Sequence, residues 1–255
     1  MSSSLLIAKY TIIDYLKSKS LFAVLIISFF LFLVTFVSSQ ITYKTVDKVI
    51  IDIGFGLTAF FIYLSSIFWG QNLITDEIEK KTVHTILSRG IRRLNFFFGK
   101  FISLLGIILL NLSILSVFVL SLYWLFGGQF EMNIIHCLWG FYLAALILSG
   151  LATFFSFFMN GYLASILTAS VYITSSIVAS TLNTTYVKRT PIVEDFLIVL
   201  KYILPDFNKL NFTDYLLSMN TVKTQDLWYI FLYGVGYVFV LNFSSYLIFN
   251  KKELN

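Results

Sequence analysis

Charged residues are scarce in this sequence. Only 12% of its 255 residues are Asp, Glu, Lys or Arg, whereas soluble domains carry roughly 25%. Hydrophobic residues make up 58% of the chain. This balance excludes an ordinary soluble domain and predicts a protein that crosses a membrane several times.

Proline and cysteine are also rare. Two prolines and 28 phenylalanines fit long uninterrupted helices better than the short alternating strands of a membrane barrel. We therefore expect an all-α membrane protein. Cys137 is the single cysteine, so no disulfide can form within the chain, and we expect a buried thiol.

The residues needed for several kinds of chemistry are missing. No G-x-x-x-x-G-K-[S/T] motif occurs, because Leu94 and Phe101 stand where the first glycine and the hydroxyl would lie around Gly99-Lys100. Metal sites need several converging ligands. His84 and His136 fall on opposite sides of the membrane in the topology derived below. We expect no enzyme activity, metal or cofactor in this chain. The net charge is +5, but the positive residues flank apolar runs, so the charge does not indicate nucleic-acid binding.

Six apolar segments have about the length needed to cross hydrocarbon, roughly 17–25 residues. They are residues 21–37, 53–69, 101–126, 134–158, 162–182 and 227–249. None contains Asp, Glu, Lys or Arg, which argues against a proton-driven carrier, since such carriers use ionisable groups within their spans. We expect the Ser, Thr and Asn side chains in these spans to bond between helices, and Gly54, Gly56, Gly234 and Gly236 to allow close packing.

The fourth and fifth spans are separated by a turn signal only. Residues 132–187 contain no charged side chain, and 56 residues are too many for one crossing. Asn160-Gly161 is the strongest turn signal in this run. It predicts two helices joined by a tight turn.

Orientation follows from the Lys and Arg residues that flank the spans. With both termini in the cytoplasm, that side receives 11 of them and the short outer loops receive two, Lys44 and Lys48. Leu5–Leu16 is weakly amphipathic and predicts an N-terminal interfacial helix. The outer loop, 183–226, contains an apolar stretch, Ile192–Leu204, that predicts an interfacial helix or a re-entrant hairpin.

One densely charged stretch lies between the second and third spans. Ile74–Lys100 holds nine of the chain's 31 Asp, Glu, Lys and Arg residues. Residues 75–88 have the spacing of a short helix that Thr75 or Asp76 would cap, followed by a basic turn at Arg89-Gly90. Its apolar stripe would rest on lipid headgroups or in a soluble partner; the stripe consists of Ile78, Val83, Ile86 and Leu87.

This stretch resembles the cytoplasmic loop of type-2 ATP-binding-cassette exporter permeases. The matching residues are Ile74, Glu77, Thr82, Ile86, Leu87, Ser88, Arg93, Phe96, Phe97, Phe98, Gly99 and Lys100. The family usually has proline shortly after Leu-Ser, where this chain has Arg89-Gly90. The runs Tyr202–Asn211 and Phe249–Leu254 resemble the subfamily associated with copper-enzyme maturation, gliding or peptide export.

The resemblance implies a function and a set of partners. It implies an exporter permease in the cell inner or plasma membrane, paired with a second permease copy or a similar permease. Two copies of a separate ATPase subunit would bind the ATP. The coupling helix would contact that subunit through Thr75, Asp76, Glu77, Ile78, Glu79, Lys81, Thr82, Val83, Ile86, Leu87, Arg89 and Arg92. The alternative is a non-transporting membrane anchor or regulatory subunit, and the sequence leaves the substrate open.

Overall fold

The computed structural model describes residues 3–41, 46–79, 91–129, 131–182, 191–218 and 224–251. The described chain is all-α, as predicted, and contains six helices long and apolar enough to cross a membrane. These spans are Lys19–Ile41, Val46–Thr75, Arg93–Leu125, Met132–Ser156, Gly161–Thr181 and Leu227–Lys251. The chain is therefore a multi-pass membrane protein.

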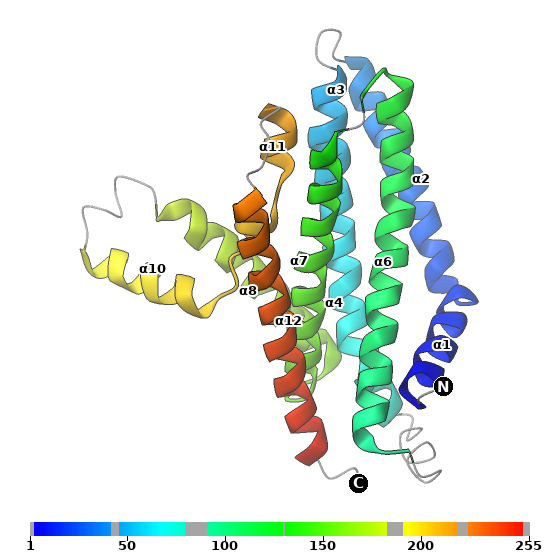
Figure 1. Cartoon of the computed structure of the whole chain (residues 1–255), viewed down its shortest axis with the longest axis vertical. Coiled ribbons are helices and arrows are strands. Elements are labelled where there is room, and N and C mark those ends of the chain that lie inside the picture. The colour runs from blue at the N-terminus through cyan, green and yellow to red at the C-terminus, as the bar shows by residue number, and fades with distance from the viewer. Residues whose placement is uncertain are drawn as a thin grey trace.

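The first four spans form the body of the bundle (Figure 1). They are α2 (Lys19–Ile41), a composite second span, α6 (Arg93–Leu125) and α7 (Met132–Ser156). The second span consists of α3 (Val46–Val49), the π-helical turn η1 (Ile50–Phe55) and α4 (Gly56–Glu79). It begins seven residues before the predicted start, because the helix already includes the polar turns that carry Asp47 and Asp52.

The helix α7 is the centre of the bundle, and 17 of its 25 residues are buried. Its closest neighbour is α4. At Gly70 of α4 a methyl group would collide with the backbone of Ser149 of α7, so only glycine allows this approach. Small residues at such crossings are the usual means by which membrane helices pack, because apolar surface alone gains little over lipid.

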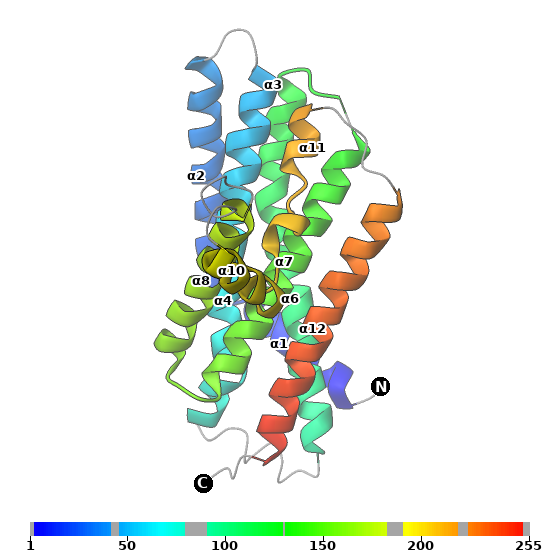
Figure 2. The same cartoon turned by 90° about the vertical axis from the view of Figure 1, so that its left-hand side faces the viewer.

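The predicted break between the fourth and fifth spans is confirmed. The helix α7 ends at Ser156, and α8 (Gly161–Thr181) begins directly after Asn160, whose backbone is extended. The last span, α12 (Thr224–Lys251), packs against α7 on another side. Both α8 and α12 lie at the periphery (Figure 1, Figure 2).

The N-terminal segment forms a helix, as predicted, α1 (Ser3–Leu16). It packs along α6, where the Tyr15 hydroxyl donates a hydrogen bond to Oδ1 of Asn111, and the Tyr15 ring meets Trp69 edge-on at 4.8 Å. Burial raises the pKa of Tyr15 to about 12, against the opposing effect of the bond to Asn111. The hydroxyl therefore keeps its proton and remains the donor.

The described part of the segment before the last span, residues 191–218, contains three short helices. The predicted apolar helix exists as α10 (Pro191–Ile203) and lies across the long axis of the bundle (Figure 1). After Pro205 the chain enters the bundle through η2 (Phe207–Leu210) and continues as α11 (Thr213–Ser218). Phe207, Leu210 and Phe212 are buried. The segment between α8 and α12 thus combines a transverse helix with an inserted stretch.

Two predictions about the interior of the spans were partly wrong. Most hydroxyls donate to a carbonyl of their own helix, as Ser66 does to Tyr63 and Thr168 to Ala164. A helical backbone offers these acceptors three and four residues away, so no second helix is needed. Gly54 and Gly234 do contact neighbouring side chains, but a methyl group at Gly56 or Gly236 would meet nothing within 4 Å.

Candidate functional site

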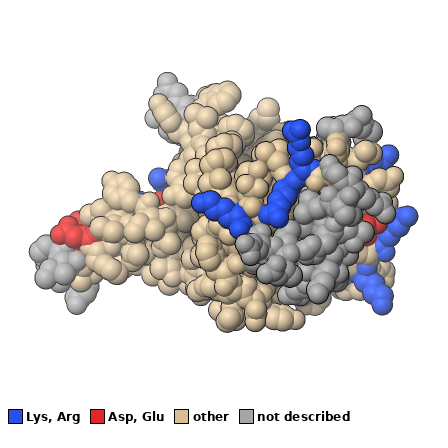
Figure 3. All heavy atoms as spheres, turned by 90° about the horizontal axis from the view of Figure 1, so that it is seen from below, with Lys and Arg blue, Asp and Glu red and all other residues tan. Residues whose placement is uncertain are grey.

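One end of the bundle carries the basic residues that flank the predicted contact segment. We call it the basic end: α4 ends there, α6 begins there and α12 ends there (Figure 1). Lys and Arg side chains stand out when the molecule is viewed from this end (Figure 3). Arg92, which precedes α6, and Lys251, the last residue of α12 as described, are both exposed.

The predicted capping of a separate helix at Thr75 or Asp76 was wrong. The helix α4 continues through both residues to Glu79, and the Thr75 hydroxyl donates to the backbone oxygen of Gln71, one turn earlier. The apolar side chains on both sides of this point favour continuation over a new start. Asp76, Glu77, Ile78 and Glu79 therefore belong to the last turns of α4.

The remaining predicted contact residues are divided by the limits of the described chain. Arg92 immediately precedes α6, with extended backbone. Lys81, Thr82, Val83, Ile86, Leu87 and Arg89 lie outside the described residues.

Aromatic packing connects α6 with α12 at the basic end. The rings of Phe96 and Phe97 lie 6.0 and 6.1 Å from that of Phe249. Nη1 of Arg93 donates a 2.9 Å hydrogen bond to the backbone oxygen of Asn250, close to the end of α12. A shift of the start of α6 would therefore displace α12 through these contacts.

A cleft of about 490 Å³ lies between α4, α7, α8 and η2. Its α4 wall runs from Gly56 to Phe68, and its α8 wall from Ser165 to Ile173. The two walls touch near the basic end, where the Ser165 hydroxyl donates to Oε1 of Gln71, and at mid-height, where the Tyr63 and Tyr172 rings are 5.4 Å apart. The volume falls in the range of small-molecule sites, roughly 300–1,000 Å³.

Polar groups gather at one end of this cleft. Asn208, Asn211 and Thr213, all from the segment around η2, line the end away from Phe68 and Ser165. Oδ1 of Asn211 accepts hydrogen bonds from the Thr213 hydroxyl at 2.7 Å and the Thr213 amide at 3.1 Å. The Sγ atom of buried Cys137 lies 3.7 Å from the same hydroxyl, which confirms the expected buried thiol.

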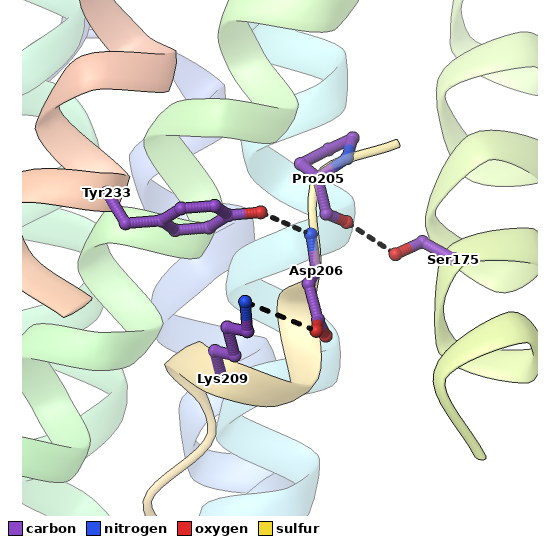
Figure 4. Close-up of polar contacts among 5 residues, drawn as sticks. All are labelled: Ser175, Pro205, Asp206, Lys209 and Tyr233. Carbon is purple, nitrogen blue, oxygen red and sulfur yellow. Dashed lines mark hydrogen bonds and ion pairs between the residues drawn. The ribbon is translucent and has the colours of Figure 1, made fainter. Parts of the chain in front are cut away.

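The inserted segment is fixed from both sides at Pro205-Asp206 (Figure 4). The Ser175 hydroxyl of α8 donates to the backbone oxygen of Pro205, and the Asp206 amide donates to the Tyr233 hydroxyl of α12 at 2.6 Å. Lys209 lies 3.9 Å from Oδ2 of Asp206 and 5.2 Å from the centre of the Tyr233 ring. These contacts hold η2 between the last two spans.

No group of three or more His, Cys, Asp or Glu side chains suited to a metal ion occurs in the part of the chain that the structure describes. His136 lies in the second turn of α7, with a buried Nδ1 that has no hydrogen-bond partner. The described residues thus do not gather around His136 the several side chains that a metal ion needs as ligands.

Sequence reasoning missed the cleft. Its residues are ordinary span and loop residues, and nothing in the spacing of Tyr63, Tyr172 or Asn208 brings them together. Gly56 lines the cleft, but the open space beside it is visible only in the folded chain, and the sequence predicted close packing there. The run Tyr202–Asn211, which includes Pro205, shows a family resemblance but no pattern that predicts a cleft.

No protein-family model matches this chain, and comparison with curated proteins finds no match. The described residues establish a multi-pass membrane protein with six apolar helices and a cleft between α4, α7, α8 and η2.

Proposed function

We propose that the chain is the membrane subunit of a type-2 ATP-binding-cassette exporter, with ATP bound and hydrolysed by a separate subunit. The observation that supports this most directly is the continuity of α4. This one helix forms a wall of the cleft from Gly56 to Phe68 and continues to Glu79, within the segment proposed to contact the ATPase. A push on residues 75–79 thus reaches the cleft along a single helix.

The mechanism uses the two contacts between the cleft walls. When the ATPase subunits close, the end of α4 moves, and the Gln71–Ser165 hydrogen bond and the Tyr63–Tyr172 ring contact are the first links between α4 and α8 to change. The links from Phe96 and Phe97 to Phe249 carry the same motion from the start of α6 to α12. Two permease copies, identical or similar, would complete the path, in line with the two-fold symmetry common among oligomers.

Binding of the ATPase subunit is tested by Ile86→Asp, with Ile86→Leu as the matched control. In a protein cleft the carboxylate would be desolvated without a partner, which costs several kcal/mol, whereas on a lipid surface it can turn toward water. We expect Ile86→Asp to abolish co-purification of the ATPase, Glu77→Lys to weaken it, and Ile86→Leu to leave it intact at equal permease yield.

Retention of a substrate-responsive ATPase by Ile86→Asp would contradict the assignment of this segment. A stably bound ATPase whose rate no transported molecule changes would instead favour the anchor or regulatory function.

The proposal also requires the basic end to face the cytoplasm. Two variants test this in a Cys137→Ser background: Lys44→Cys and Arg89→Cys. Intact cells that carry each variant are treated with a membrane-impermeant thiol reagent. We expect labelling at position 44 and none at position 89. The reverse pattern would exclude contact with a cytoplasmic ATPase.

A further inference from the structure

We propose that the cleft between α4 and α8 binds a single-chain amphipathic molecule, with its acyl chain along the helices and an uncharged polar head beside Asn208 and Asn211. The description of this molecule as cargo rests on the proposed function. The binding itself is a property of the permease and is tested without the ATPase.

The walls have the length and chemistry for one acyl chain. Twelve residues separate Gly56 from Phe68, which corresponds to about 18 Å of helix. One leaflet of a bilayer has about 15 Å of hydrocarbon, half the full thickness, so the cleft is about as long as one lipid chain. Ala59, Ile67 and Leu148 line it together with aromatic rings.

The cleft is accessible from the lipid phase. Its rim residues Phe60, Leu64 and Phe68 on α4, and Ile166 and Ile173 on α8, are exposed large apolar side chains. A molecule already dissolved in the bilayer would enter sideways between these two helices. A water-soluble molecule would have to cross this apolar rim, which favours a ligand delivered by the membrane.

The polar end selects an uncharged head. Asn208 and Asn211 are exposed residues that line this end. The bonds from Thr213 occupy Oδ1 of Asn211 and orient its amide, so that its NH₂ group can donate. The cleft lining contains no Asp, Glu, Lys or Arg among the described residues. Asp206 and Lys209 flank Asn208 in the chain but lie 3.9 Å from each other beside Tyr233 of α12 (Figure 4).

Hydroxyl-bearing heads fit this end best. An amide group donates and accepts, as a hydroxyl does, whereas a charged head would find no counter-ion among the side chains that line the cleft. A monoacylglycerol therefore represents the ligand class. A fatty acid with the same chain represents the charged alternative, and a plain alkane represents chain binding alone.

The experiment uses the purified full-length permease in phosphatidylcholine nanodiscs. Three photoreactive probes carry a diazirine on identical chains: a monoacylglycerol, a fatty acid and an alkane. We expect saturable labelling by the monoacylglycerol, located by peptide mass spectrometry within residues 56–68 and 165–173, and at least tenfold weaker competition by the fatty acid.

Matched variants separate the cleft from the general lipid surface. Ala169→Phe fills the α8 wall and is expected to reduce labelling at least tenfold, whereas Ser170→Phe, the next residue and outside the lining, leaves it unchanged. Ala59→Phe fills the cleft from α4 and repeats the test if Ala169→Phe does not fold. Asn208→Leu with Asn211→Leu should lower monoacylglycerol labelling about fivefold and leave alkane labelling unchanged.

Three outcomes would overturn the proposal. They are unsaturable labelling spread over the exposed faces, equal labelling of Ala169→Phe and the unmodified protein, and a disulfide between copies at Ile166→Cys in the Cys137→Ser background. The last would show that a second copy covers the cleft. None of these results bears on ATPase co-purification, so failure of ligand binding and failure of the exporter proposal remain distinguishable.

Discussion

The helices α7 and α8 follow each other in the chain but have opposite environments. In α7, 17 of 25 residues are buried, and in α8 only 4 of 21 are. Yet α8 carries more small residues, twelve Gly, Ala, Ser or Thr against eight in α7. Small residues are expected at helix interfaces. The comparison shows that the number of small residues in a helix does not decide how much of that helix is buried.

The difference comes from what the small residues face. Along α7 they meet backbone, as Ser149 meets Gly70 of α4 and Gly140 meets Leu210 before α11. Along α8, by contrast, Ala169 lines the cleft and Ser170 is exposed on the surface. Close backbone contact holds α7 against its neighbours, whereas α8 is joined to its neighbours by hydrogen bonds from Ser165 and Ser175 and by the ring contacts of Tyr172.

The largest effect is expected for Gly70→Ala. The added methyl group collides with the Ser149 backbone, which cannot move as a side chain does. Overpacking against yielding side chains costs roughly 1–3 kcal/mol, so we expect a loss of stability of about 3 kcal/mol or more. Thermal unfolding in detergent, followed by loss of the monodisperse protein, measures it.

The control for this variant is Gly56→Ala on the same helix. Its methyl group meets nothing within 4 Å, and alanine is favoured over glycine in a helix by roughly 0.5–1 kcal/mol. We expect unchanged or slightly raised stability. Equal losses for the two variants would refute the close α4–α7 contact.

Gly140→Ala is expected to cost about 1–3 kcal/mol. Its methyl group meets the backbone oxygen of Leu210 and the Phe212 ring, but the inserted segment can shift locally and relieve part of the collision. The same unfolding measurement applies, together with loss of acyl-probe labelling as Asn211 moves. Gly236→Ala on α12, with open space around it, should match the unmodified protein.

Tyr233→Phe removes the acceptor of the Asp206 amide and leaves a buried donor unpaired. We expect a loss of about 1–2 kcal/mol, the usual cost of such a group. Tyr229→Phe, one turn earlier at an exposed position, is the control and should change stability by less than about 0.5 kcal/mol. If both variants behave alike, the bond between η2 and α12 does not hold the segment.

The smallest effect is expected for Ser175→Ala. The lost donor leaves a backbone carbonyl, which has two lone pairs and tolerates partial pairing better than an amide does. Polar contacts between membrane helices average about 0.6 kcal/mol, and we expect a loss of that size. Ser170→Ala, whose hydroxyl donates to its own helix at Ile166, should be neutral in the same unfolding assay. A loss above about 2 kcal/mol for Ser175→Ala would show that α8 is held more firmly than this comparison implies.

The sequence by itself determined the six apolar helices and the turn at Asn160-Gly161, whereas for Ile192–Leu204 it left a helix and a re-entrant hairpin open. The six helices and the turn follow from length, from apolar composition and from local turn chemistry, which act over neighbouring residues. The charged residues around Thr75 did not show that α4 continues past it, because helix continuation depends on the whole run of residues before it. The structure shows α4 helical through Thr75 and Asp76 as far as Glu79, the last described residue before position 91.

Only the tertiary structure decided which faces of these helices meet. Most membrane-buried hydroxyls are satisfied within their own helix, so their presence carries no information about a partner helix. The contact of Gly140 with Leu210, 70 residues apart, and the bonds of Ser175 and Tyr233 to Pro205-Asp206 depend on the crossing of helices, which no local pattern specifies. Because the cleft is the space that these crossings leave between α4, α7 and α8, it exists only in the folded chain.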